Sequence, residues 1–292
     1  MKTNKTDSAA QQEYMLAHLR HHRFVRWARL LLLVFFLALW EFCADKGLID
    51  SFFFSSPSRV AACFVSMLQN KSLFLHIGVT LTETVVSFLL IVLISLAAAT
   101  LLWHSKRLSE IAEPYLIVLN SLPKSALAPL LIVWLGTGID TIIVAGISVA
   151  VFGAVISLYT GFLQVDPEKL KLIYTLGGSR QDTFFKVVLP ASVPTVLSSM
   201  KVNIGLALVG VIIGEFLAAR RGLGYLIIYS SQVFQLDVLI TAILLLCIIA
   251  MGLYQIIQFA EHWYKNARIK GSIKFCVKFM IPCCFSPFRV LR

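Results

Sequence analysis

The sequence predicts an all-α, polytopic membrane protein with about six transmembrane helices, and two observations support this fold class. Hydrophobic residues make up 58% of the 292 residues and charged residues only 14%, with a mean hydropathy of +0.83. Soluble domains are rarely this apolar. Apolar stretches also recur along the whole chain, and all but the first reach the roughly 20 residues that a helix needs to cross a bilayer. Most of the length therefore belongs to one membrane domain.

The chain begins with a polar, basic segment, residues 1–28, in which arginines recur at three-residue spacing. Most of them would share one helical face, which suits anionic lipid headgroups. The apolar run LLLLVFFLALWEFCA follows and has no small-x-small cleavage pattern after it, so we expect an uncleaved first span over 29–44. Residues 45–76 contain the turn signal SSPS and then an amphipathic stretch, which predicts a short interfacial helix.

Five more spans are expected, and together with the first they define one transmembrane domain over 29–265. Their expected ranges are 77–103, 113–135, 139–163, 195–219 and 236–260. The basic, apolar tail 266–292 fits either a segment lying on the membrane surface or a disordered extension.

The formal net charge of +11 would suggest nucleic acid in a soluble protein. Here Lys and Arg fall mainly between and outside the apolar runs, as expected for cytoplasmic loops, and no nucleic-acid partner is expected. With six spans, 20 of the 26 basic residues lie on the side of both termini and five on the other side. This asymmetry places both termini in the cytoplasm.

No catalytic or metal-binding pattern is visible in the sequence. The six cysteines form no C-x-x-C pair and no Cys/His cluster with zinc spacing, so neither a metal nor a cofactor is expected. There is no G-x-x-x-x-G-K-[ST] phosphate loop and no nucleophile-base arrangement. A membrane enzyme therefore has no support in the sequence.

The segment 164–190 has the local pattern of two short helices joined by a glycine elbow. Pro167 suits a first turn, and Gly177-Gly178 suits a helix end because glycine takes left-handed conformations readily. Ser179 fits an N-cap with Asp182 three residues later, and Pro190 is expected either to close the second helix or to begin the next element. A structured loop of about 30 residues is more often functional than a mere connection. We expect it to dock a cytoplasmic partner; the alternative is a helical hairpin on its own bilayer surface.

A family resemblance rests on this segment and three others. The pattern G-x9-V-x-L-P, from Gly177 to Pro190, resembles the cytoplasmic loop of binding-protein-dependent ABC importer permeases. Three further stretches resemble the nitrate/sulfonate/taurine group of that family: WEFCADKGLIDSFFFSSPSRV (40–60), LNSLPKSALAPLLIVWLGTG (119–138) and GEFLAARRGLGYLI (214–227). Together the similarity covers roughly 28–265. One departure is Lys171-Leu172-Ile173, where the family has an acidic-Ala-Ala triplet that would pair ionically with the ATPase.

The resemblance implies a type I ABC importer permease fold in the plasma membrane of a prokaryote. It implies two ABC ATPase subunits inside, a solute-binding protein outside, a homodimer of permeases and the lipid bilayer as partners. Segment 164–190 would be the coupling helix that inserts into a groove of the ATPase. The residues expected to make this contact are Leu176, Gly177, Gly178, Ser179, Arg180 and Pro190.

The solute implied is a small anion such as nitrate, a sulfonate or taurine, although the same group also handles heterocyclic vitamin precursors. The alternative class is a secondary transporter or channel that is not driven by ATP. Such proteins often show inverted repeats and relays of ionisable residues within the membrane, and neither is visible here.

Polar residues inside apolar spans are the candidates for the translocation pathway. These are Asn120, Ser121, Lys124, Ser125, Lys201, Asn203 and Glu215. Lys124 would either attract a passing anion or serve packing by snorkelling or pairing with an acid. Glu215 would either belong to a gate or pair with a basic residue, and Glu83 is a second such acid.

Overall fold

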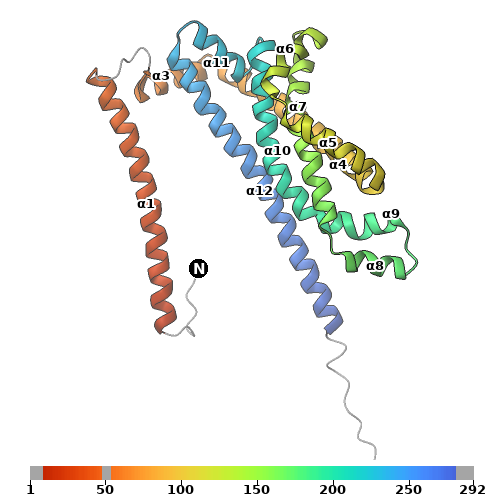
Figure 1. The fold of residues 1–292 in the computed structure, drawn as a ribbon. Coiled ribbons are helices and arrows are strands. Elements are labelled where there is room, and N and C mark those ends of the chain that lie inside the picture. Colours follow the sequence, from red (N-terminus) through yellow and green to blue (C-terminus); the bar gives the residue numbers. More distant parts are fainter. Residues whose placement is uncertain (1–8, 48–53, 281–292) are drawn as a thin grey trace, which may run out of the picture. The chain divides into compact units, whose positions relative to one another are not determined.

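The computed structural model describes residues 9–47 and 54–280, and every regular element in these ranges is helical, which confirms the all-α class (Figure 1). In chain order the elements are α1 (Ala9–Asp45), α3 (Pro57–Gln69), α4 (Ser72–His104), α5 (Lys106–Ser121), α6 (Lys124–Leu135), α7 (Ile139–Leu163), α8 (Pro167–Thr175), α9 (Arg180–Thr183), the π-helix η1 (Phe184–Val188), α10 (Leu189–Ala218), α11 (Leu223–Gln232) and α12 (Leu236–Met280). Of the expected tail 266–292, residues 266–280 continue α12 as helix, and residues 281–292 lie outside the described residues.

Among the described residues, five helices are long and apolar enough to cross a membrane. A sixth is obtained if α5 and α6 are one broken span, since these two helices meet at 94°. The span expected over 113–135 is thus divided at Leu122-Pro123, where proline lacks the N–H that a continuous helix requires. The expected fourth span, 139–163, coincides with α7.

The chain divides into two compact units. The first comprises Met1–Asn70 with Ser230–Thr241, and the second comprises Lys71–Tyr229 with Ala242–Arg292. In the first unit, the Ser56 side chain caps the expected amphipathic helix, α3, by accepting from the Arg59 backbone N–H. Arg59 pairs with Asp237 at 2.9 Å, and the Ser58 hydroxyl donates to Glu41 at 2.7 Å. These contacts hold α3 to the end of α1 and to the beginning of α12 within this unit.

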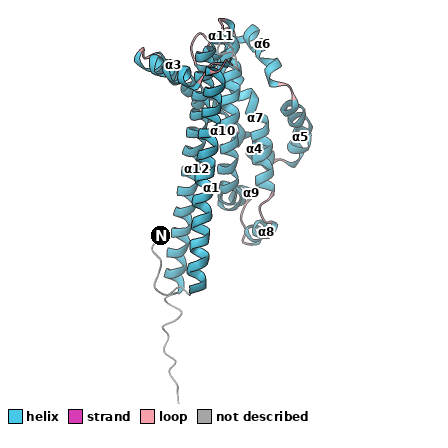
Figure 2. Cartoon of the chain, turned by 90° about the vertical axis from the view of Figure 1, so that its left-hand side faces the viewer, coloured by secondary structure: helices cyan, strands magenta, loops and turns pink. Residues whose placement is uncertain are grey.

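In the second unit, α7 is the central helix and packs against both α4 and α10 (Figure 2). The α4 face toward α7 and α10 is a buried stripe of small polar and apolar side chains at helical spacing. The approach of α7 and α10 is close: a Cβ on Gly210 would lie 2.8 Å from the Cα of Gly146. Small residues are what allow membrane helices to pack backbone against backbone.

The two ends of this helical core carry different features. Figures 1 and 2 both show α8 and α9 at one end of α7 and α10, and α6 near the opposite end. Arg220 and Arg221 share a cavity with Thr137 and Gly138, which directly follow α6. The loop that carries the two arginines is therefore far from the predicted docking segment along the long axis of the core.

Candidate functional site

The segment 164–190 contains the glycine elbow that the sequence predicts. Asp166 caps α8 by accepting a hydrogen bond from the Glu168 backbone N–H at 2.9 Å. Gly177 has φ +79°, and the Gly178 N–H donates to the Ile173 carbonyl at 2.9 Å. This left-handed residue with its closing hydrogen bond is how many helices end. The elbow exposes the turn between α8 and α9.

The second half of the segment begins with the expected capping box. The Ser179 hydroxyl accepts from the Asp182 N–H at 3.1 Å, and the Asp182 carboxylate accepts from the Ser179 N–H at 3.1 Å. Lys186 adds an ion pair to Asp182 at 2.6 Å. Of the two alternatives for Pro190, the structure agrees with the second: η1 leads directly into α10, and Pro190 lies in the first turn of α10, where a missing N–H is tolerated.

An aromatic cluster anchors the segment to the core. Phe184 is 1% exposed and lies against Trp103 of α4 and Phe162 of α7, with ring centroids at 5.1 and 5.5 Å. Arg180 reaches the same place: its Nη2 donates to the Trp103 carbonyl at 3.0 Å, and its guanidinium lies 5.3 Å from the Trp103 ring centroid. The segment is thus fixed to the ends of three core helices, α4, α7 and α10.

The other face of the segment is apolar and exposed. Leu176, at the elbow, is 75% exposed, and Leu172 and Tyr174 are also exposed large hydrophobic residues. An anchored helical segment with apolar side chains at its tip is suited to insertion into a groove on another protein. Of the residues predicted to make the docking contact, Leu176 presents its side chain outward, whereas Arg180 is engaged with α4.

Four of the predicted pathway residues gather at the break between α5 and α6. Lys124 Nζ donates to the carbonyls of Leu119 and Asn120 at 2.6 and 2.8 Å, and it lies 5.7 Å from the Phe152 ring centroid. The Asn120 side chain faces Gly153, where an added Cβ would lie 3.2 Å from its Oδ1. The remaining two members of this group are Ser121, which donates to the Ile117 carbonyl at 2.9 Å, and Ser125. The lysine thus caps carbonyls that the break leaves without helical partners.

The structure places the other three pathway residues elsewhere. Lys201 forms an ion pair with Glu261 of α12, and its ammonium lies 6.0 Å from the Tyr254 ring centroid. Asn203 is buried, and its amide donates to Ser199 at 3.2 Å. The seven candidates therefore form no single continuous row along one helix.

Glu215 organises the opposite end of the core. Its carboxylate accepts from the Thr80 hydroxyl at 2.7 Å and from the Gly224 N–H at 2.5 Å. Thr80 accepts in turn from the Leu223 N–H at 2.8 Å, and His76 Nδ1 accepts from the Gly222 N–H at 3.1 Å. The expected pairing of Glu215 with a basic residue is corrected: its partners are a hydroxyl and the backbone of the loop after α10.

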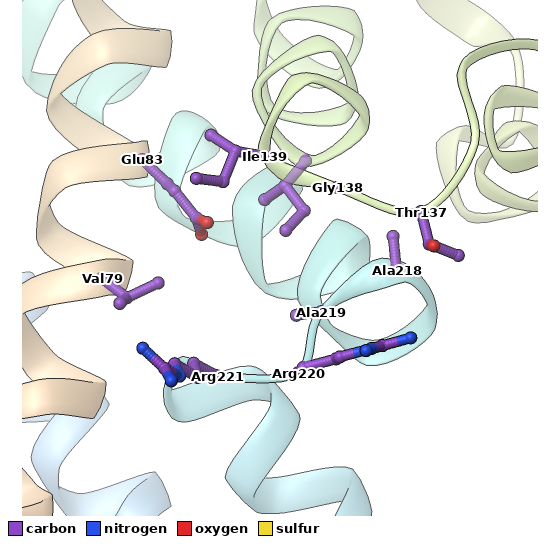
Figure 3. A pocket seen from close by; sticks show the side chains of 10 residues that line it. Val79, Glu83, Thr137, Gly138, Ile139, Ala218, Ala219, Arg220 and Arg221 are labelled. Atoms are coloured by element: carbon purple, nitrogen blue, oxygen red, sulfur yellow. The ribbon is translucent and has the colours of Figure 1, made fainter.

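The hydrogen bonds around Glu215 fix the loop after α10 beside a cavity of about 550 Å³. Ten residues line the cavity: Val79, Glu83, Thr137, Gly138, Ile139, Ile142, Ala218, Ala219, Arg220 and Arg221. Figure 3 shows Glu83 pointing into it from α4, with Arg220 and Arg221 on the opposite rim. It is therefore a concave site with one acid and two guanidinium groups.

Sequence reasoning missed His76, Thr80 and Trp103 as partners of the candidate sites. A signal for Thr80 was available: the buried polar residues Thr80, Glu83, Thr84, Ser87 and Ser95 recur at helical spacing along an apolar span. Polar residues in this pattern indicate a face turned to other helices rather than to lipid. Nothing in the local sequence signals that Trp103 receives Arg180.

Comparison with a family model and comparison with individual relatives identify the same family. Residues 91–260 match the family model of the binding-protein-dependent transport system inner membrane component. The chain is 31% identical over 233 residues to an ABC transporter permease protein of Haemophilus influenzae, covering 80% of this chain and 94% of that protein. It is 25% identical to the taurine transport system permease protein of Escherichia coli, covering 73% and 80% of the two chains. It is also 25% identical to the formylaminopyrimidine transport permease protein of Halalkalibacterium halodurans, covering 66% and 77%.

Solved structures share the fold at lower identity. The methionine ABC transporter MetNI, in an inward-facing conformation, aligns with a TM-score of 0.57 at 20% identity over 66% of this chain and 94% of that chain. An amino acid ABC transporter aligns with a TM-score of 0.54 at 17% identity over 70% and 98%. At these identities the likeness concerns the fold alone, and the fold is that of type I ABC importer permeases.

Proposed function

We propose a transport mechanism from the premise that this chain belongs to the family of binding-protein-dependent transport system inner membrane components, the permease subunits of ABC importers. In this proposal the chain is the membrane-spanning subunit through which a small solute enters the cell. An external binding protein delivers the solute, and two ATPase subunits on the cytoplasmic side drive the cycle. Two copies of the chain form the pathway between them.

The single observation that carries this proposal is the anchored, outward-facing elbow at Leu176. Its side chain is 75% exposed, while Phe184, eight residues later, is 1% exposed among aromatic side chains of α4 and α7. A movement imposed on the elbow by an ATPase would therefore be passed to the core helices, because protein cores transmit displacement rather than absorb it. Rocking of these helices would alternate access between the two sides of the membrane.

The departure at Lys171-Leu172-Ile173 fits a contact that is mainly apolar. Leu172 is exposed beside Tyr174 and Leu176, so the end of α8 nearest the elbow offers hydrophobic side chains to the groove. Such a contact gains its free energy from apolar burial and depends little on salt.

The proposed solute is a small anion such as nitrate, a sulfonate or taurine. One relative is a taurine permease, which supports this class, while another is a formylaminopyrimidine permease. The cationic groups available to an anion along the chain include Lys124 at the helix break and Arg220 and Arg221 at the cavity. Selectivity in the complex would be set largely by the external binding protein.

The proposed membrane is the plasma membrane, with both termini in the cytoplasm. This arrangement requires the broken pair α5 and α6 to count as one span, giving six crossings. It places the elbow inside and the loop with Arg220 and Arg221 outside, as the distribution of basic residues predicts.

Purification of the native complex tests the proposal. We expect a stoichiometric ATPase subunit to accompany the chain, and solute uptake into liposomes to require ATP and the binding protein. Uptake that follows an ion gradient, in a preparation that contains no ATPase, would instead establish the alternative class, a secondary transporter or channel.

A further inference from the structure

Two acidic side chains, Glu83 of α4 and Glu215 of α10, lie together inside the second unit. Glu83 is only 3% exposed and Glu215 is fully buried. Their carboxyl groups are within hydrogen-bonding reach of each other, although an ionised carboxylate has no hydrogen to donate. Among the described residues, no basic side chain forms an ion pair with either acid. Two like charges this close in a buried site are strongly disfavoured, so the pair holds a proton in place of a counter-ion.

The hydrogen bonds around the pair place this proton on Glu83. Glu215 is surrounded by donors, which are the Thr80 hydroxyl at 2.7 Å, the Gly224 N–H at 2.5 Å and the Tyr225 N–H. Such a set of donors stabilises an ionised carboxylate. Glu83, by contrast, has a buried Oε2 that receives no hydrogen bond from any described residue. A proton on Glu83 turns this group from an acceptor without a donor into a donor to Glu215.

The same carboxylate closes the loop that follows α10. The N–H groups of Leu223 and Gly224, at the start of α11, donate to Thr80 and Glu215 respectively. In this closed conformation Leu223 is fully buried. The loop therefore depends on the position of Glu215, which repulsion from an ionised Glu83 would disturb.

Other charged groups near the pair act in different ways. The lysines of the neighbouring helices are bound elsewhere: Lys124 of α6 donates to carbonyls of α5, and Lys201 of α10 pairs with Glu261. His76 of α4 holds the same loop, because its Nδ1 accepts from the Gly222 N–H at 3.1 Å. Protonation of that nitrogen removes the acceptor, so acid would open the loop through His76, an effect opposite in sign to that of the glutamates. The charged and titratable groups on the elements around the pair are His76, Asp140 in the first turn of α7, Arg220 and Arg221 in the loop, and Tyr225 and Tyr229 of α11.

We propose that Glu83 and Glu215 share one proton, and that this proton latches the loop after α10. Loss of the proton from Glu83 to an external base takes the pair from one negative charge to two and removes the hydrogen bond that joins α4 to α10. The resulting repulsion releases Glu215 from the loop. The latch is therefore closed at neutral pH and opens as the pH rises. This inference goes beyond the proposed transport role and does not depend on it, because a proton site requires neither ATP nor solute.

Infrared spectroscopy detects the proton directly, because a protonated carboxyl absorbs apart from a carboxylate. The full-length chain, with the subunits that co-purify with it, is measured in lipid nanodiscs at neutral pH. We expect a protonated-carboxyl band that is lost in Glu83→Gln and retained in Glu215→Gln. Glu110→Gln replaces an exposed acid of α5 and is the control, which should leave the band unchanged. Absence of the band in wild type, or its retention in Glu83→Gln, would overturn the proposal.

The accessibility of Leu223 reports whether the proton closes the loop. In a background without native cysteines, Leu223→Cys probes a fully buried position and Arg220→Cys an exposed one. The ratio of their labelling rates with an impermeant maleimide cancels the effect of pH on the reaction itself. We expect this ratio to rise by about tenfold from neutral to alkaline pH, within the usual range of coupling between sites. In Glu83→Gln, whose amide still donates to Glu215 but does not titrate, the ratio should stay low at both pH values.

Three results would contradict the latch. A wild-type ratio that stays constant until the complex unfolds would show that the loop does not depend on the proton. A rise that persists in Glu83→Gln would belong to another group, and opening only at acidic pH that is abolished by His76→Gln would make His76 the latch instead.

The test does not rest on a single variant. If Glu83→Gln does not assemble, the wild type decides, because the infrared band and the closed loop must be lost over the same pH range. If Leu223→Cys does not assemble, hydrogen exchange of the wild-type segment 219–225, corrected for its intrinsic pH dependence, takes its place.

Discussion

Arg180, the first residue of α9, and Trp103, near the end of α4, are joined in two ways. The guanidinium donates to the Trp103 carbonyl at 3.0 Å and lies 5.3 Å from the centre of its ring. The carbonyl belongs to the last turn of α4, where helical partners are missing, so a cation there satisfies both the acceptor and the helix dipole. This contact links the docking segment directly to a core helix.

The first prediction is that Arg180→Leu uncouples the ATPase from transport without releasing it. The substitution removes the link between α9 and α4, while the apolar elbow that we propose to dock remains. We expect solute-stimulated ATP hydrolysis to fall by about tenfold, within the usual range of coupling energies, with normal co-purification of the ATPase. Arg107→Leu, which removes an exposed arginine at the start of α5, is the control. Loss of the ATPase from purified Arg180→Leu would show that Arg180 is a docking residue instead.

The second prediction concerns the elbow. Gly177 has φ +79°, a conformation that costs residues other than glycine about 1–2 kcal/mol and β-branched residues more. An added Cβ would meet no atom of the chain within 4 Å, so a side chain there projects toward the partner. We therefore expect Gly177→Val to abolish ATPase co-purification and stimulated ATP hydrolysis in liposomes, without loss of the membrane core.

Gly177→Asn is the matched variant, because asparagine accepts left-handed backbone better than other residues. It should retain more of the coupling than valine does. Wild-type co-purification and ATP hydrolysis in a correctly inserted Gly177→Val variant would remove the elbow from the coupling mechanism.

The elbow was predictable from sequence because its determinants are local. Gly177 follows the last residues of α8, and the capping box joins Ser179 to Asp182, three positions later. The residue type at each of these positions is determined by the local backbone conformation and by its neighbours in sequence. The same holds for α7, whose apolar run has the length of one span.

The contacts that make up the candidate sites were not predictable from the sequence, because they join residues that lie far apart along the chain. Arg180 and Trp103 are 77 residues apart in sequence, Thr80 and Glu215 are 135 apart, and His76 and Gly222 are 146 apart. Such pairs depend on how the helices pack, and a single sequence carries no direct record of it. The division of α5 from α6 lies between these cases, since Pro123 signals a break but not its 94° angle.

The third prediction concerns sidedness. Leu176 and Arg220 are both exposed and lie at opposite ends of the second unit. In a background that lacks the six native cysteines, a cysteine at Leu176 should react with an impermeant maleimide only from the cytoplasmic side, and one at Arg220 only from outside. Labelling of both from one side would mean that α10, the candidate span between them, does not cross the membrane and that the expected number of spans is wrong.

The fourth prediction concerns Lys124. Lys124→Met removes the positive charge at the break together with the donors to the carbonyls of Leu119 and Asn120. We expect reduced uptake and a raised apparent KM for an anionic solute, with normal expression and normal co-purification of the ATPase. Lys124→Arg keeps the charge and the donors, so it should restore most of the uptake. Unchanged uptake and apparent affinity in Lys124→Met would show that the lysine serves packing only.

The last prediction concerns the Lys201–Glu261 ion pair, which joins α10 to α12 within the second unit. Both side chains are largely buried, with 19% and 10% of their surfaces exposed. Removing one member of such a pair leaves the other charge in a poorly solvated site, whereas replacing both by apolar residues is often tolerated. We therefore expect Lys201→Met and Glu261→Leu each to lower the melting temperature of the detergent-solubilised complex, and the double variant to recover most of that loss.

The same variants show whether Lys201 also contacts solute. A double-mutant cycle separates the interaction between the two residues from the other effects of each substitution. If the pair only fixes α12 to α10, uptake should return together with stability in the double variant. If stability returns and uptake does not, the Lys201 charge is needed on the pathway itself, as the sequence predicts. A double variant no more stable than the single ones would show that the two residues act independently, and that something other than this ion pair holds the two helices together.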